Sequence, residues 1–355
     1  MKALITAGGH GTRLRPITYT QNKHLIPIAN KIMLQYAIDY VKEAGIREIG
    51  IIINANDNSI QNVFGNGENL GVEITYIHQD KPLGLAHVVK ISQSFIGDEN
   101  FIFYLGDNIL VGGVKPFIND FNEMNSNCHL VLSQVLDPNR FGVAEVIKNR
   151  IISIEEKPKS PKSDLAVTGI YIYDSNIFEA VNNIAPSKRG ELEISDAHQF
   201  LIENGYEVSF SEITGWWKDT GQPSDLLDAN CLVLDNIKSK NNGNIDDMSK
   251  MTGEVIIGKN SSIINSIIKG PVIIDNDCII KDSYIGSYSS IGKNCKITNA
   301  KVEYSILMEG CVLDSLNQIM KSSLLGKNVK VVGSNNQNNN STFLLGDQSY
   351  VELVD

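Results

Sequence analysis

Isoleucine recurs at every sixth position in the last third of the chain. It occupies positions 267, 273, 279, 285, 291 and 297, and the small residues Ser283, Ser289 and Cys295 stand two positions before the last three. An α-helix repeats its faces about every 3.6 residues and a strand about every 2, so neither explains this pattern. A period of six is typical of a coil whose triangular turns each use three short strands. The sequence therefore predicts a left-handed parallel β-helix, with the isoleucines pointing inward and the small residues at tight corners.

A β-sandwich with a coincidental spacing is the alternative fold, and six isoleucines in one register make it the weaker explanation. Before the repeat, residues 236–250 (NIKSKNNGNIDDMSK) are rich in polar and poor in apolar side chains, as linkers are. A chain of 355 residues also exceeds what one core usually organises. We therefore expect an N-terminal domain over 1–235, a linker over 236–250 and the β-helix domain over 251–355.

The N-terminal domain alternates apolar strand-like runs with amphipathic helix-like stretches, the pattern of βαβ units around a mostly parallel sheet. The expected strands are Ala3–Ala7, Ile49–Ile53, Ile74–His78, Phe101–Leu105, His129–Ser133 and Ala166–Tyr173. The expected helices are Met33–Ala44, Leu85–Ser94 and Val114–Met124. The predicted fold class is α/β: a Rossmann-like, mixed but mostly parallel sheet with flanking helices, followed by the C-terminal β-helix. Ligands bind beyond the carboxyl ends of such strands, so the turn after the first strand is a candidate binding site.

The charge of the chain restricts its partners. A net charge of -10 and a pI of about 5.2 leave no overall basic surface for a phosphate backbone, so we expect no nucleic-acid partner. No apolar run approaches the roughly 20 residues of a membrane span. The first residues (MKALITAGG) lack the layout of a signal peptide. We therefore expect a cytoplasmic protein with no membrane partner.

A glycine-rich segment, TAGGHGTR, occupies residues 6–13 directly after the first expected strand. It lacks the third glycine of the dinucleotide fingerprint and the Gly-Lys-Ser/Thr ending of a P-loop. Three glycines would still let a phosphate approach the backbone N–H groups, namely Gly8, Gly9 and Gly11. For the glycines alone a plain tight turn is the better interpretation. Thr12 and Arg13, a permanently charged planar donor, favour a phosphate site.

Several further motifs follow in order: NKHLIPIANK after the first loop, Gln79 with PLGLA (82–86), LGDN (105–108), RFGV (140–143), EEKP (155–158), RGELEISD (189–196), WKDTG (217–221) and LGDQS (345–349). With GGHGTRLRPIT at the start, they resemble the sugar nucleotidylyltransferase family, and within it the long-form glucose-1-phosphate thymidylyltransferases. The resemblance covers essentially the whole chain. It implies an enzyme that transfers a deoxythymidylyl group from dTTP to glucose-1-phosphate and releases pyrophosphate.

The resemblance also implies how the charged residues act. Asp107 and Asp219 would hold Mg²⁺, a hard cation that prefers carboxylate oxygens. Arg13 and Lys23 would bind the nucleotide phosphates and Lys157 the sugar phosphate, and these three catalytic cations would offset the repulsion between two anionic substrates. Because a phosphate oxygen is already a nucleophile, no general base is needed. Taken singly, Asp107 is better explained by a chain turn and Lys23 by a solvated surface charge. Asp219 is ambiguous alone, and Lys157 could belong to a solvated charge run.

Neutral and acidic residues would shape the two binding pockets in the same way. Glu156 would accept hydrogen bonds from the sugar hydroxyls, and the pocket would be completed by Leu85, Asn108, Gly142 and Val167. The nucleotide would contact the glycine loop, that is Gly8, Gly9, Gly11 and Thr12. Gln79 and Gly84 would read the base, because an amide donates and accepts along a pyrimidine edge and a glycine lets the base approach the backbone.

Three other functions stay open at this point. UTP could replace dTTP, since no motif encodes the thymine methyl group or the ribose hydroxyl. A noncatalytic regulatory homologue would be expected to lack the charged residues, which are all present. A bifunctional nucleotidyl and acetyl transferase would need a base in the β-helix, yet the six histidines (10, 24, 78, 87, 129 and 198) all precede it. We therefore expect the β-helix to serve packing or assembly into a homo-oligomer.

Overall fold

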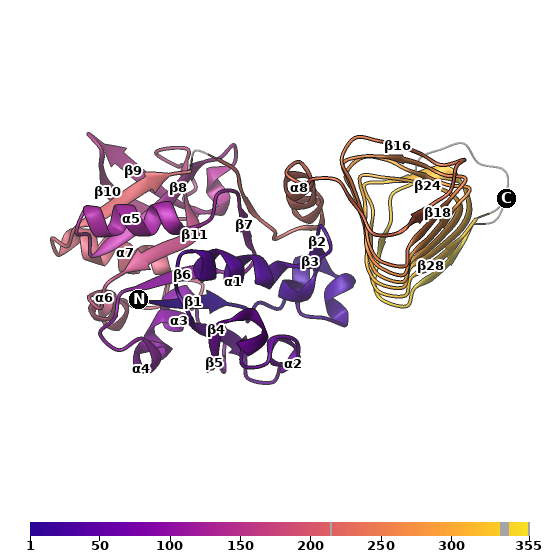
Figure 1. Cartoon of the computed structure of the whole chain (residues 1–355). Coiled ribbons are helices and arrows are strands. Elements are labelled where there is room, and N and C mark those ends of the chain that lie inside the picture. Colours follow the sequence, from indigo (N-terminus) through magenta and orange to yellow (C-terminus); the bar gives the residue numbers. More distant parts are fainter. Residues whose placement is uncertain (214, 334–340, 354–355) are drawn as a thin grey trace. The chain divides into compact units, whose positions relative to one another are not determined.

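The computed structural model describes residues 1–213, 215–333 and 341–353. The chain divides into two compact units (Figure 1). The first comprises Met1–Gly9 and Leu34–Asp219, and the second His10–Met33 and Thr220–Asp355. A short N-terminal segment therefore belongs with the C-terminal part of the chain. The division at residues 235 and 251 stays a prediction of the sequence.

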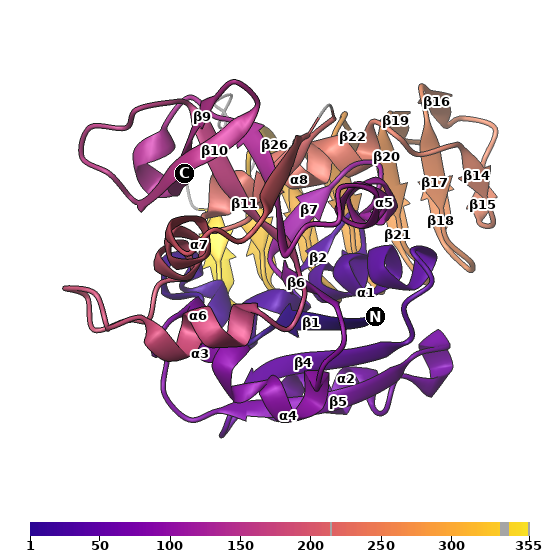
Figure 2. The same cartoon turned by 90° about the vertical axis from the view of Figure 1, so that its left-hand side faces the viewer.

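A mixed nine-stranded sheet organises the first unit. Its central order is β10 (Arg150–Glu156), β9 (Gly142–Ile147), β11 (Leu165–Tyr173), β6 (Phe101–Leu105), β1 (Lys2–Thr6), β4 (Glu48–Asn54) and β5 (Glu73–Gln79), and β8 (Cys128–Gln134) and β12 (Val208–Glu212) extend it beside β11. Strands β6, β1, β4 and β5 run parallel, whereas β11 is antiparallel to β6, β8 and β9. Figure 2 shows β6, β1, β4 and β5 side by side. The α/β prediction and all six expected strands are confirmed.

Helices cover both faces of this sheet because its strands are apolar on both sides. Leu4, Phe101 and Phe103 pack in one buried cluster with α3 (Leu85–Ile91), α4 (Gln93–Ile96), α6 (Ile177–Asn183) and α7 (Ile194–Glu203). On the other face, the ring of Tyr104 contacts Tyr40 of α1 (Met33–Glu43). The expected helices at 33–44 and 114–124 are confirmed as α1 and α5 (Lys115–Glu123). The third is divided into α3 and α4 at Ser92, whose hydroxyl donates to the Val88 carbonyl.

His198 of α7 is a fully buried histidine in this core. Its Nε2 lies 2.6 Å from the Tyr173 hydroxyl, and its ring packs against the rings of Tyr171 and Tyr173. Its Nδ1 has no hydrogen-bond partner in the described part of the chain. Burial lowers the pKa of His198 from 6.5 to about 3, because the charged ring would lose its hydration.

The variant His198→Phe is expected to remove part of the acid sensitivity of the fold. Below pH 6.5 the unfolded chain binds a proton at His198, while the folded chain stays neutral there down to about pH 3. The free energy of unfolding therefore falls as the pH falls through this window, by about 2 kcal/mol at pH 5 from this residue alone. The lost contact with Tyr173 costs the variant the same at every pH. Urea unfolding at pH 7.5 and pH 5 should show that the free energy of unfolding of His198→Phe falls less between the two pH values than that of the unaltered protein. The control His10→Phe, at an exposed position, should show the same fall as the unaltered protein. If His198→Phe differs from the unaltered protein by the same amount at both pH values, the prediction is wrong.

The C-terminal strands wind into the expected left-handed parallel β-helix, whose triangular coils are visible in Figure 1. Val255, Val272 and Ser289 lie in register on successive coils, 17 residues apart. Because 17 is one less than three sixes, one side of each of these coils must be a residue shorter than the other two. The interior positions accordingly step from Ile263 to Ile268, not to residue 269.

This short step corrects part of the predicted register. Ile285, Ile291 and Ile297 point inward as expected. The prediction is wrong for Ile267 and Ile279, which are 50% and 42% exposed, and for the half-buried residue 273, whose inward neighbour is Ile274. A strict period of six drifts out of phase with a coil of 17 residues, so the same spacing reaches the outer face on one coil and the interior on the next.

The first coil begins inside the stretch that the sequence suggested as a linker. Strands β14 (Lys240–Asn241) and β15 (Asn244–Ile245) pair in parallel with β17 (Val255–Ile257) and β18 (Ser262–Ile264). Their polar side chains face outward on a coil whose backbone groups are paired. Among the described residues, no helix combines the length and the apolar character that a membrane crossing requires.

Candidate active site

Two acidic residues, Asp107 and Asp219, lie on neighbouring backbone segments at the carboxyl end of β6. Asp107 lies in the turn after β6, and Asp219 ends β13 (Trp217–Asp219), where it stands directly opposite Asn108 of β7 (Asn108–Leu110). The described residues contain no group of three or more His, Cys, Asp or Glu side chains that could hold a metal. Two carboxylates suit Mg²⁺, which usually takes its other ligands from water and substrate phosphates.

Asn108 joins this acidic pair to the neighbouring strands. It is buried, its amide nitrogen donates to Asp107 Oδ1 at 3.1 Å, and the Trp217 indole donates to its Oδ1. Gly169 of β11 lies so close that an added Cβ would be 2.8 Å from Asn108 Nδ2. The Trp217 ring also contacts the Phe141 ring, with centroids 5.5 Å apart. Asn108 and Trp217 thus link Asp107, through side-chain contacts, to Phe141, the residue before β9.

Three residues expected in the sugar pocket are immediate neighbours in the sheet. Gly142 begins β9 and pairs with Glu156 of β10 on one side and with Val167 of β11 on the other. An added Cβ at Gly142 would lie 2.7 Å from Ser195 Oγ and 3.3 Å from Glu156 Oε2. A glycine here therefore leaves the Glu156 carboxylate the space that a side chain would fill.

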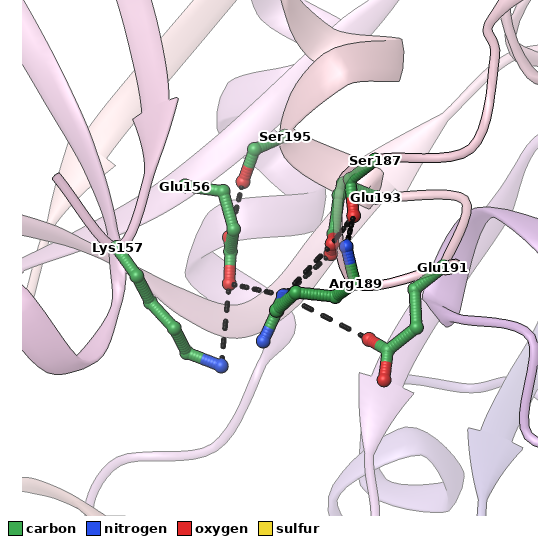
Figure 3. A network of polar contacts seen from close by, with 7 residues as sticks. All are labelled: Glu156, Lys157, Ser187, Arg189, Glu191, Glu193 and Ser195. Atoms are coloured by element: carbon green, nitrogen blue, oxygen red, sulfur yellow. Dashed lines mark hydrogen bonds and ion pairs between the residues drawn. The ribbon is translucent and has the colours of Figure 1, made fainter.

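Glu156 is held by a network of polar contacts that Figure 3 shows from close by. The Ser195 hydroxyl donates to Glu156 Oε2 at 2.7 Å, and Arg189 Nη2 and Lys157 Nζ lie 3.4 and 3.6 Å from Oε1. Arg189 also donates to both oxygens of Glu193, at 3.1 and 2.8 Å. The carboxylate is therefore fixed through Oε2, while Oε1 faces two cations that are both more than 40% exposed.

The carboxylates of this network shift the pKa values of Arg189 and of the neighbouring Asp196. Burial by itself would lower the pKa of Arg189, but its hydrogen bond to Glu193 and the charges of Glu193, Glu191 and Glu156 raise it. Burial, and then the charges of Glu193 and Glu156, raise the pKa of Asp196. Arg189 consequently stays charged at any physiological pH and offers a fixed positive charge beside Glu156.

Sequence reasoning assigned no role to Arg189, Glu193 or Ser195, although the motif at 189–196 was recognised. The available signal was an arginine four residues before a glutamate, a spacing at which opposite charges can form an ion pair. Nothing in the spacing indicated that this turn would pack against β10. That contact depends on the tertiary arrangement of α7 over the sheet.

Gly84 and Leu85 lie beside the same turn. Gly84 has a φ of 101°, and an added Cβ would meet the Leu192 carbonyl oxygen at 2.3 Å, so only glycine fits. The Leu192 amide donates to the Leu83 carbonyl, and the Leu192 carbonyl accepts from the Ala86 amide. Gln79 ends β5, with its side-chain nitrogen 3.1 Å from His87 Nδ1. His87, whose pKa burial lowers, is a further neighbour that the sequence did not single out.

The glycine loop crosses the boundary between the two units. Gly8, after β1, would bring an added Cβ within 3.2 Å of Asn54 Oδ1, and Gly9 is exposed. In the second unit, Gly11 has a φ of 59°, and an added Cβ would lie 3.0 Å from Lys23 Cβ. The exposed Thr12 and Arg13 follow in a short 3₁₀ helix, Thr12–Leu14.

Two glycines in the second unit leave room for the expected cations. Besides Gly11 next to Lys23, an added Cβ at Gly221 would stand 3.0 Å from Arg13 Nη2. Lys23 begins a further 3₁₀ helix, Lys23–Leu25, and is half-buried. In the first unit, Asp219 lies opposite Asn108, the residue after Asp107. Gly142 lies between Glu156 and Val167, with Lys157 beside Glu156. Gly84 and Leu85 lie at the start of α3, and Gln79 lies at the end of β5. The second unit gathers Gly11, Arg13 and Lys23 around short 3₁₀ turns.

Comparison with known proteins identifies close relatives. A family model described as nucleotidyl transferase matches residues 2–236. The chain is 44% identical over 292 residues to a glucose-1-phosphate thymidylyltransferase of Streptomyces griseus, a match that covers 82% of either chain. Residues 2–236, which the family model matches, include the glycine loop and every strand of the mixed sheet.

Solved structures agree with the sequence matches. A Bacillus anthracis structure assigned to the glucose-1-phosphate thymidylyltransferases, in complex with a sucrose, is 40% identical with a TM-score of 0.63, and the match covers 68% of this chain and 98% of that one. A UDP-glucose pyrophosphorylase complexed with UDP-glucose is 26% identical with a TM-score of 0.60, and the match covers 66% of this chain and 99% of that one.

Proposed function

Because the chain belongs to the nucleotidyl transferase family, and is therefore a nucleotidyltransferase, we propose that it transfers a deoxythymidylyl group from dTTP to glucose-1-phosphate. The products are dTDP-glucose and pyrophosphate. The observation that carries this choice of substrates is the 44% identity, over 82% of the chain, to a relative named for this reaction.

The neighbourhood of Glu156 suits a sugar phosphate. A carboxylate accepts hydrogen bonds from several hydroxyl groups, and the Ser195 hydroxyl orients it through the oxygen that the sugar would not use. Lys157, beside Oε1, would bind the phosphate group of the same ligand. Leu85, Asn108, Gly142 and Val167 would form the walls of the pocket. A sugar phosphate held at both ends has one orientation for attack, which is what an in-line displacement needs.

The nucleotide would be bound mainly through its phosphates. Backbone N–H groups of Gly8, Gly9, Gly11 and Thr12 would meet the phosphate oxygens, and Arg13 and Lys23 would neutralise their charge. Gln79 and Gly84 would recognise the base. These positively charged and N–H groups stabilise the charge that builds up on the leaving pyrophosphate, so they account for rate as well as binding.

Mg²⁺ is the cofactor that the carboxylate pair fits. Asp107 and Asp219 would hold it, and when bound it would lower the negative charge of the phosphate oxygens. Two protein carboxylates leave the remaining positions to water and substrate, in keeping with the two acidic side chains found at this edge of the sheet.

A uridylyltransferase is the nearest alternative, favoured by the likeness to a UDP-glucose pyrophosphorylase at 26% identity. The higher identity to the thymidylyltransferase favours dTTP. An added acetyltransferase activity has less support, because none of the histidines lies beyond residue 198 and the β-helix therefore lacks the usual base.

A pyrophosphate-release screen tests the proposal directly. Purified protein with Mg²⁺ and glucose-1-phosphate is assayed against each nucleoside triphosphate. We expect dTTP to give the highest kcat/KM, UTP a lower one and the purine nucleotides the lowest, by about a hundredfold, because a pocket built for a pyrimidine excludes the larger base. UTP exceeding dTTP would establish the alternative. Consumption of acetyl-CoA in a parallel assay would reveal the second activity.

Two further predictions concern the setting of the enzyme. We propose a cytoplasmic location, where nucleoside triphosphates are available. We also propose a homo-oligomer, supported by the exposed isoleucines 267 and 279 on the outer faces of the β-helix. Cell fractionation and sedimentation velocity measure these properties.

A further inference from the structure

Part of one face of the β-helix is covered within the second unit. The face is a seven-stranded sheet in the order β14, β17, β20 (Val272–Ile274), β23 (Ser289–Ile291), β25 (Ile306–Leu307), β27 (Leu324–Leu325) and β29 (Leu344–Leu345), and the covered part lies on β23, β25 and β27. Ser290, Ile306 and Leu324 are in register, and each alternates with a neighbour that belongs to the interior cluster, so they point outward. Nevertheless, they are 0%, 1% and 2% exposed. Side chains that point away from the interior are buried only where another part of the chain covers them.

The segment that carries Lys23 contacts this region on both sides of the lysine. Before it, the Thr20 hydroxyl donates to Asp347 Oδ2 at 2.7 Å and Gln21 Nε2 lies 3.2 Å from Met308 Sδ. After it, Asn30 Nδ2 donates to the Ile291 carbonyl at 2.8 Å. The ten residues from Gln21 to Asn30 are therefore tied at both ends to coils of the β-helix.

A buried asparagine of α8 (Pro223–Leu234) joins the same two elements. Asn230 is 0% exposed, and its Oδ1 accepts from the Ala29 amide at 2.9 Å and from the Ser290 hydroxyl at 2.7 Å. Its Nδ2 donates to the Tyr288 carbonyl at 3.1 Å. A buried polar side chain with its partners satisfied on both sides specifies one arrangement, because any shift would leave a partner unpaired.

The backbone at the contact needs this support. Ala29 and Asn30 form the two-residue turn between β2 (Pro27–Ile28) and β3 (Lys31–Ile32), with φ values of 46° and 61°. Such a turn requires left-handed conformations at both positions, which asparagine tolerates and alanine disfavours. The hydrogen bond from the Ala29 amide to Asn230 stabilises the disfavoured residue at the place where β-helix and turn meet.

We propose that the β-helix positions the nucleotide-binding loop, and that Ser290, Asn230 and Asn30 are positioning residues for Lys23. The inference rests on the proposed function in one respect, that Lys23 binds the triphosphate. Only three residues separate Lys23 from the start of β2, so the short connecting segment restricts the position of the lysine relative to the anchored turn. A loop released from the β-helix would sample more conformations. Binding of the triphosphate would then be weaker, because the loop would lose more conformational entropy on binding.

The test compares two neighbouring serine-to-alanine variants in the full-length protein. Ser290→Ala removes the hydroxyl that bonds to Asn230. Ser289→Ala is the matched control, since this residue is also 0% exposed but lies in register with the interior Val272, and its hydroxyl has no partner in the described part of the chain. Ser290→Ala should raise the KM for dTTP about fivefold and leave the KM for glucose-1-phosphate within about twofold.

Hydrogen exchange gives a readout that does not depend on turnover. In Ser290→Ala the peptide covering residues 26–32 should exchange about tenfold faster, because the Ala29 amide loses its oriented acceptor, and in Ser289→Ala it should not change. Asn30→Gly is a second variant that keeps the left-handed turn and removes only the side-chain bond to the β-helix. It should reproduce both effects.

The outcomes separate the inference from the proposed function. An unchanged KM for dTTP in Ser290→Ala and Asn30→Gly would overturn the positioning role, even with faster exchange, since the contact would then be structural only. An equal rise in both KM values, or in Ser289→Ala, would overturn it as well. Were the unaltered protein to make no nucleotide sugar, the proposed function would fail, and unchanged exchange in Ser290→Ala would then overturn the contact itself.

Discussion

Replacing Asp107 with asparagine is expected to lower kcat/KM for nucleotide-sugar synthesis by about a thousandfold, because a bound cation contributes several kcal/mol of charge stabilisation and its site would lose one of two carboxylates. The amide keeps an oxygen that can accept from Asn108 Nδ2, so the turn after β6 should keep its conformation. Steady-state kinetics over a range of Mg²⁺ concentrations measure the loss. Titration calorimetry with Mn²⁺ measures cation binding independently of turnover.

The matched control is Asp98→Asn, an exposed aspartate in the loop before β6 that loses the same charge. It should leave both turnover and Mn²⁺ binding unchanged. Near-normal turnover in Asp107→Asn would remove this residue from the metal site. Lost turnover with unaltered Mn²⁺ binding would instead assign it a contact with substrate.

Replacing Lys157 with methionine should raise the KM for glucose-1-phosphate about thirtyfold, since a hydrogen bond between charged groups contributes about 2 kcal/mol. The side chain is 46% exposed and lies 3.6 Å from Glu156 Oε1, so it can reach a ligand without leaving the carboxylate. Methionine keeps the length and much of the apolar stem, which limits the effect on folding. Initial-rate kinetics at saturating dTTP give the KM.

The matched control is Lys159→Met, which removes the same charge from an exposed position two residues further along the segment that follows β10. It should leave the KM for glucose-1-phosphate within about twofold. A selective rise in the KM for dTTP in Lys157→Met would place this lysine at the nucleotide. Equal effects of both substitutions would show that general surface charge, not one contact, attracts the substrate.

Local patterns were sufficient for most of the fold. Short continuous apolar runs, separated by helix-like stretches, predicted β1, β4, β5, β6, β8 and β11, because a strand buried on both faces needs such a run. The six-residue repeat predicted the β-helix, but the side chains of Ile267 and Ile279 face outward because a coil of 17 residues is not a whole number of sixes. The break at Ser92 was also missed, since a hydroxyl that bonds to the preceding turn leaves no mark in apolar spacing.

The two architectures, and the charged and glycine residues of the site, could be predicted from the chain alone, since they depend on short spacings and on side-chain chemistry. Which of these residues contact one another follows from the three-dimensional packing. Gly142 lies between Glu156 and Val167 through strand pairing, and Arg189 reaches Glu156 through the packing of α7. Likewise, the turn at Ala29 meets Asn230, some 200 residues away, through burial against the β-helix. Such contacts arise from the packing of whole elements, and a pattern along the chain records each element but not its neighbour.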